Sequence, residues 1–190
     1  MNLTQVPISM IDTSAGDAGK VLTSDGTSWS AASKLTSGTA VTLTTQSSVD
    51  FTGIPSWVKR ITVMFASASV TSSSGILIKI GAGSIDSAGY ISSSAVIYGV
   101  SPGNPGTATN TTGFLIGATG IEGSGFIGGS AILNLLDSNT WVMQSCLGVP
   151  AVTRTIYSGG SKELSGVLDR IRIEAGGGSF DAGKINIVWE

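Results

Sequence analysis

Apolar and polar residues alternate with a period of two over much of the chain from Lys34 onward, which is the pattern of β-strands that bury one face. The alternation is clearest over residues 41–51, 60–65, 76–80, 170–174 and 184–190. Its apolar members are Val41, Leu43, Val49, Phe51, Ile61, Val63, Phe65, Ile76, Ile78, Ile80, Ile171, Ile173, Ile185, Ile187 and Trp189. We expect each strand to place these side chains against a second sheet, with Trp189 buried although it is the penultimate residue.

Clusters of Gly, Ser and Asn separate these segments and predict tight turns at 71–75, 81–89, 101–112, 158–162 and 175–179. Residues 131–136 and 141–147 are predicted to form a hairpin around Asp137-Ser138-Asn139. Turn signals spaced by roughly ten residues are typical of β-sandwiches and jelly rolls. The pattern therefore predicts an all-β fold, a jelly-roll-like β-sandwich over residues 34–190.

Residues 1–33 lack this alternation, and we expect them to form an extended N-terminal arm that is separate from the 34–190 domain. The arm nevertheless keeps more apolar residues than a solvated tail would retain: Val6, Ile8, Ile11, Val21, Leu22 and Trp29. We expect these side chains to anchor the arm on another protein. The alternative is a flexible tail.

Within this arm, residues 19–29 read Gly-Lys-Val-Leu-Thr-Ser-Asp-Gly-Thr-Ser-Trp. This stretch resembles the leader that joins the attachment arm to the exposed body in fibre and appendage proteins of tailed bacteriophages. Residues 51–65, 166–173 and 180–187 resemble core strands of the C-terminal domain of the same proteins, whereas residues 81–150 carry no such resemblance.

The resemblance implies a non-enzymatic structural protein of the virion, assembled in the host cytoplasm. It implies a homotrimer that binds another virion protein through residues 1–33 and contacts a glycan or protein of the host surface as a short tail fibre or spike. The alternative is a head fibre or capsid decoration protein docked on the major capsid protein, because the chain is short and has no shaft repeats. A third alternative is an enzyme acting on host glycans, since two carboxylates can meet in the fold.

Composition removes several other functions. The net charge is −2 and only 12% of the residues are charged, which gives no electrostatic basis for binding nucleic acid or an anionic membrane. The apolar tract 114–136 is interrupted by Glu122 and by glycines, so we expect no membrane insertion. With no histidine and one cysteine, the chain lacks the residues of a Ser-His-Asp triad or a His/Cys metal site. We therefore expect no catalytic, cofactor-binding or metal-binding residue.

Aromatic residues beside small polar loop residues make adaptable contact sites. Tyr90, Tyr98 and Tyr157 occupy such positions, and Asn104 lies in the proline-stiffened turn 101–106. These four residues are the candidates for receptor contact, the alternative being ordinary strand and loop residues. Cys146 is flanked by Met143 and Leu147 and is predicted to be a small buried residue.

Charge is unevenly distributed along the chain. Residues 80–153 contain no Lys or Arg, and their acidic residues are Asp86, Glu122 and Asp137. Depletion of charge is typical of the centre of a subunit interface, so we expect this stretch to supply much of the trimer contact. The alternative is that it forms the sandwich interior together with neutral loops.

Overall fold

The computed structural model describes residues 20–24, 29–33, 35–71, 75–99, 106–117 and 125–190, and for 20–24 and 29–33 it describes the backbone alone. β-Strands are the main regular structure of these residues, and the other regular element among them is a short 3-10 turn at Pro150–Val152. The chain divides into one unit of residues Met1–Thr36 and a second of residues Ser37–Glu190, close to the boundary expected after residue 33.

The second unit contains two antiparallel sheets. The larger is a nine-stranded sheet with the order β10-β9-β14-β13-β12-β6-β16-β3, in which β4 also pairs with β16. Its strands are β3 (Thr36–Ser37), β4 (Val41–Thr42), β6 (Arg60–Val70), β9 (Ile91–Tyr98), β10 (Gly106–Asn110), β12 (Ile127–Asp137), β13 (Thr140–Val149), β14 (Arg154–Glu163) and β16 (Phe180–Trp189).

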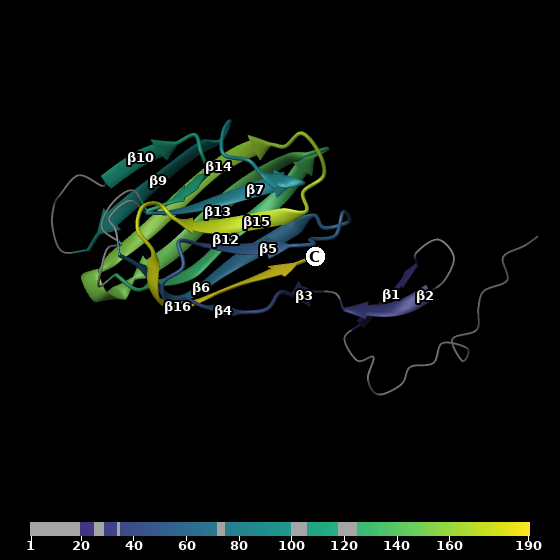
Figure 1. The fold of residues 1–190 in the computed structure, drawn as a ribbon, viewed down its shortest axis with the longest axis horizontal. Helices are drawn as coiled ribbons and strands as arrows, with labels where there is room; N and C mark the ends of the chain where they lie inside the picture. The colour runs from purple at the N-terminus through teal and green to yellow at the C-terminus, as the bar shows by residue number, and fades with distance from the viewer. Residues whose placement is uncertain (1–19, 25–28, 34, 72–74, 100–105, 118–124) are drawn as a thin grey trace, which may run out of the picture. The chain divides into compact units, whose positions relative to one another are not determined.

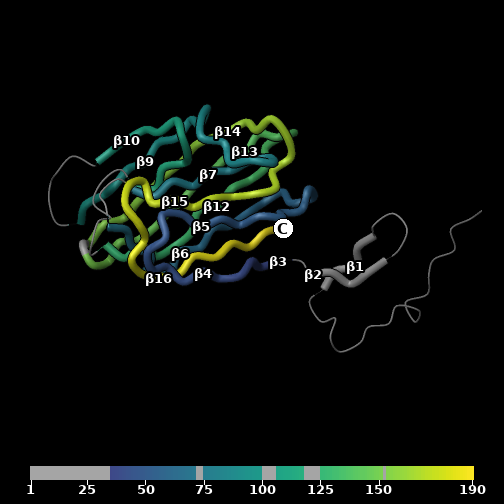
Figure 2. Tube along the Cα trace, viewed as in Figure 1, coloured from purple at the N-terminus to yellow at the C-terminus, as the bar shows by residue number. Residues whose placement is uncertain are grey.

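The smaller, five-stranded sheet has the order β11-β7-β15-β5, and β8 also pairs with β7. Its strands are β5 (Ser48–Thr52), β7 (Ile76–Ala82), β8 (Ser84–Ile85), β11 (Phe114–Ile116) and β15 (Arg170–Ala175). The two sheets lie face to face (Figure 1), and the Cα trace in Figure 2 shows the chain passing repeatedly from one sheet to the other. The expectation of an all-β fold is confirmed.

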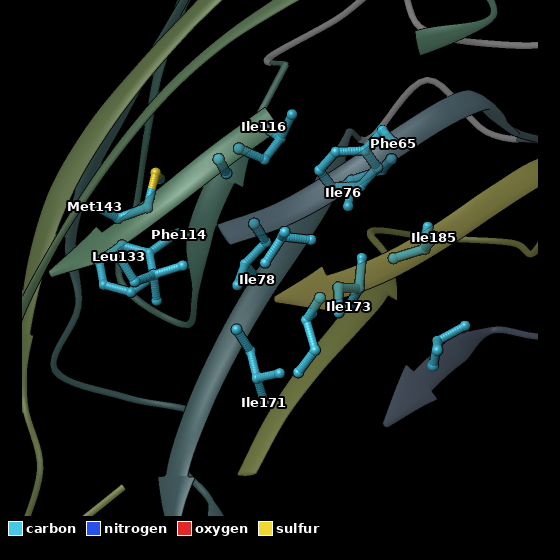
Figure 3. Packing of buried hydrophobic residues seen from close by; sticks show 14 of the residues in the cluster. Phe65, Ile76, Ile78, Phe114, Ile116, Leu133, Met143, Ile171, Ile173 and Ile185 are labelled. Carbon is cyan, nitrogen blue, oxygen red and sulfur yellow. The ribbon is translucent and has the colours of Figure 1, made fainter. Parts of the chain in front are cut away.

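One hydrophobic core fills the space between the sheets. Ile61, Val63 and Phe65 point into it from β6 and are at most 4% exposed, as their alternation predicted. Figure 3 shows side chains from both sheets meeting there, among them Ile78 and Ile173 of the smaller sheet. Burial of a large aliphatic or aromatic side chain contributes about 1.5–3 kcal/mol, so this shared interior is the main stabilising feature of the fold.

The hairpin expected over residues 131–147 is confirmed: β12 and β13 pair antiparallel from Gly128↔Gly148 to Asp137↔Thr140. Two of the expected turns are wrong. Residues 158–162 belong to β14, and the expected turn at 101–112 contains β10. In β14 the Gly159-Gly160 pair does not break the strand. Gly160 lies so close to β9 that a Cβ there would collide with the carbonyl oxygen of Ile91, so this glycine permits strand packing.

The first unit contains a hairpin instead of the expected extended arm. β1 (Lys20–Ser24) and β2 (Trp29–Ser33) pair antiparallel, from Lys20↔Ser33 to Ser24↔Trp29. The sequence between the two strands contains Asp25-Gly26, a dipeptide that is common in hairpin connections. Of the anchoring candidates, Val6, Ile8 and Ile11 lie outside the described residues, whereas Val21 and Leu22 fall in β1 and Trp29 in β2, where the backbone alone is described.

Trp189, expected to be buried, is half-buried and packs against the core at the end of β16. Its neighbours Ile185 and Ile187 on the same face are fully buried. The Trp189 indole Nε1 is also buried, with no hydrogen-bond partner among the described residues. The last strand therefore belongs to the sandwich up to its final residues.

Candidate interaction surface

The outer face of the larger sheet carries four cross-strand rows of uncharged residues, which we call the neutral face. In an antiparallel sheet, directly paired residues point to the same side, so the registers define each row. The two central rows are Thr107, Ala95, Tyr157, Cys146, Ser130, Met64 and Asn186, and Thr109, Ser93, Gly159, Gln144, Ile132, Thr62 and Val188. The shorter flanking rows are Ile97, Thr155, Gly148 and Gly128, and Ile91, Ser161, Val142 and Asn134.

Large apolar side chains are exposed on this face. Ile91, Ile97 and Tyr157 are 75%, 51% and 48% exposed. At the centre the rows enclose a shallow depression of about 660 Å³, whose lining includes Tyr157, Gln144 and Cys146. Charged residues reach only the margins, where Arg60 ends one row beside Asn134 and pairs with Glu190 at 3.0 Å.

The outer face of the smaller sheet is charged instead. Arg172 of β15 donates two hydrogen bonds of 2.7 Å to the carboxylate of Asp50 on β5, and these bonds hold the pKa of Asp50 below its ordinary value. Lys79 of β7 lies 2.9 Å from the carboxylate of Glu174 on β15. The carboxylates and cations of this face are paired with each other, and Lys79 is only 8% exposed, so the two outer faces of the sandwich differ in character.

Tyr90, a candidate for receptor contact, does not lie on either face. It is 2% exposed, its hydroxyl accepts a 2.8 Å hydrogen bond from the backbone N–H of Ile80, and the same hydroxyl lies 3.2 Å from the carbonyl oxygen of Asp86. The ring meets Phe114 edge-on, with centroids 5.0 Å apart. A buried ring cannot contact a host surface, so the expectation for Tyr90 is corrected to a structural role.

Replacing Tyr90 by Phe is expected to lower the free energy of unfolding by about 1–3 kcal/mol, because the buried N–H of Ile80 loses its acceptor. Urea denaturation followed by circular dichroism measures the change. The matched control is Tyr98→Phe, which removes a hydroxyl that makes no hydrogen bond to the described residues and should change stability by less than about 0.5 kcal/mol. Equal effects of the two variants would contradict the role assigned to the Tyr90 hydroxyl.

Burial also raises the pKa of Tyr90 well above its ordinary value. In the unfolded chain this phenol ionises near pH ~10, whereas in the folded protein it stays protonated. Its stabilising contribution is therefore complete below pH ~10 and is lost as the pH rises further. The Tyr90→Phe protein should show a shallower loss of stability at alkaline pH than the parent protein.

The other receptor candidates do not form one site. Tyr98 and Tyr157 lie on neighbouring strands but face opposite sides of the sheet. Tyr98 packs partly against the core, with the guanidinium of Arg154 4.7 Å from its ring centroid. Tyr157 belongs to the neutral face, and Asn104 lies outside the described residues.

Cys146 is exposed, contrary to the expectation of a buried residue. Its strand neighbours Met143, Ser145 and Leu147 are buried, and the register places Met143 and Leu147 in the core. Met143, Ser145 and Leu147 share one parity of β13, whereas Cys146 shares the opposite parity with Val142 and Gln144. The neutral face was therefore readable in part from β13 itself, where the outward positions are uncharged.

The chemistry of the described residues is limited. No group of three or more Cys, Asp or Glu residues among them could hold a metal ion. No helix in this part of the chain is long and apolar enough to cross a membrane. The depression on the neutral face is lined by hydroxyl, amide, thiol and apolar groups, with no carboxylate or amine. Such an arrangement can make neutral hydrogen bonds and apolar contacts.

Comparisons of the chain with protein-family models, with curated proteins and with solved structures give no match.

Proposed function

We propose that the chain is a non-enzymatic structural protein of a tailed-phage virion, a short trimeric fibre or spike that contacts the host surface. The observation that carries this proposal is the division between a small N-terminal hairpin unit and an all-β unit with its own core. An isolated two-stranded hairpin is at best marginally stable in water, so β1–β2 needs a partner surface. In this proposal that partner is another virion protein.

The strand pairing supports a jelly-roll topology, an architecture common in viral capsid proteins. Such a fold is a long hairpin rolled up, so the first strand pairs with the last and the inner strands pair in nested order. Here β5 pairs with β15, β6 with β12, β7 with β11, and β9 with β10. In this reading β13 and β14 are an inserted hairpin that widens one sheet, and β16 is a further strand beside β6.

A non-enzymatic role agrees with the residues at the depression. General acid–base catalysis uses a positioned titratable group. The lining of the depression contains no carboxylate and no amine. The thiol of Cys146 has no histidine to activate it, because the chain contains none. A glycan-acting enzyme is thus the least supported of the three functions.

A head fibre or capsid decoration protein is the second candidate. One feature favours it: β2 ends at Ser33 and β3 begins at Thr36, so no shaft separates the hairpin unit from the sandwich unit. A protein without a shaft suits docking close to a capsid surface. Both candidates use the N-terminal unit as the anchor.

Deleting residues 1–33 tests this anchor. The truncated protein is expected to keep a cooperative unfolding transition, because all core residues in the described part of the chain lie in Ser37–Glu190, and to be absent from purified particles. Circular dichroism measures folding, and mass spectrometry of particles measures incorporation against the full-length chain. Incorporation of the truncated chain at the full-length level would contradict the anchoring role, and loss of folding would contradict the division into two units.

A further inference from the structure

The two outer faces of the sandwich offer different surfaces to a partner. On the smaller sheet, Asp50, Arg172, Lys79 and Glu174 satisfy one another in ion pairs. On the larger sheet, the neutral face crosses seven strands in its two central rows without a charged side chain. A protein surface normally mixes both signs of charge, and charge depletion is a feature of interface centres.

The neutral face is large enough for a specific contact. Strands lie about 4.8 Å apart and two residues along a strand span about 6.6 Å, so the four rows cover roughly 700 Å² of sheet. A standard interface buries about 800 Å² on each partner. The exposed Ile91, Ile97 and Tyr157 supply apolar contact area within these rows.

We infer that the neutral face binds the same face of further copies of this chain, with Tyr157, Gln144 and Cys146 near the centre of the contact. This inference rests on the proposed homo-oligomer and names the surface that forms it. Neutral surfaces meet without like-charge repulsion, so the faces of three identical copies can meet around a common axis, each copy contacting two neighbours. A charged partner, by contrast, would find no complementary charge on the rows.

Gln144→Glu tests the inference with a nearly isosteric change that adds one carboxylate per subunit to the exposed centre of the face. Burying like charges between copies should raise the dissociation constant of the full-length oligomer at least ~10-fold. Light scattering and sedimentation over a concentration series measure it. The matched control is Thr52→Glu, an exposed position on β5 of the charged face opposite Arg170, which should leave the dissociation constant unchanged.

Cys146 gives an independent readout, because it is the one thiol of the chain and is exposed in the single subunit. In the native oligomer it should react with a maleimide reagent at least ~10-fold more slowly than in the urea-unfolded chain, and Gln144→Glu should restore fast labelling when it causes dissociation. Circular dichroism confirms that the variant stays folded.

Several results would overturn the inference. They are a monomeric full-length chain at micromolar concentration, an oligomer whose Cys146 labels at the unfolded rate, and an oligomer that Gln144→Glu leaves intact. A monomer with protected Cys146 would mean that the chain's own N-terminal residues cover the face. A monomeric chain would also contradict the proposed trimer, whereas the other results leave the trimer in place and reject this face as its contact. None of them bears on incorporation into particles, which tests the proposed virion role separately.

Discussion

Replacing Phe114 by Ala is expected to lower the free energy of unfolding by ~3–5 kcal/mol. Phe114 is completely buried in β11, where its ring meets the Tyr90 ring edge-on. Truncation removes the transfer free energy of the ring and leaves a cavity between the sheets, because the β7 and β14 backbones on either side cannot collapse fully.

Phe126→Ala is the matched control for this prediction. Phe126 precedes β12 and is 44% exposed, so the same truncation there should cost less than about 1 kcal/mol. Urea denaturation at equal protomer concentration compares the two variants and removes any contribution from association. If Phe114→Ala is as stable as Phe126→Ala, the two sheets do not share the core described above.

Replacing Gly160 by Ala is the second large effect, an expected loss of ~1–3 kcal/mol from overpacking. The added methyl group would collide with the carbonyl oxygen of Ile91 and would lie 3.1 Å from Cδ1 of Phe114. Because the first obstacle is backbone, the variant must push β14 away from β9.

The neighbouring glycine is a control on the same strand. A Cβ at Gly159 would have its nearest neighbour, the carbonyl oxygen of Met143, at 3.7 Å, which is an ordinary contact. Gly159→Ala should therefore leave the melting temperature unchanged or raise it slightly, since alanine restricts the unfolded chain. If the Gly160→Ala and Gly159→Ala proteins have the same melting temperature, β14 and β9 do not pack closely at Gly160.

Much of the sandwich was predictable because strand parity reports burial directly. Ile61, Val63 and Phe65 alternate with less buried residues and lie in the core, and β12–β13 forms the predicted hairpin. The glycines of β14 misled the prediction, because a Gly-Gly pair signals a turn by sequence but here lets two strands approach. That distinction depends on a neighbour, Ile91, which is far away in the sequence.

The surface was harder to predict than the core. Tyr90 follows a loop, and its buried hydroxyl finds a hydrogen-bond partner in the N–H of Ile80, which no local pattern reveals. The neutral face combines strands from distant parts of the chain, so single-strand patterns show only fragments of it. The charge-depleted residues 80–153 supply four strands of the neutral face, and β14 and parts of β6 and β16 supply the rest.

The proposed function makes this chain a structural component of a phage particle. Mass spectrometry of purified particles, combined with antibody labelling of the chain in electron micrographs, tests it most directly. The chain should copurify with intact particles in a fixed ratio to the major capsid protein, with label at the tail for a fibre or over the head for a decoration protein. A chain that accumulates in infected cells but is absent from purified particles would contradict the claim.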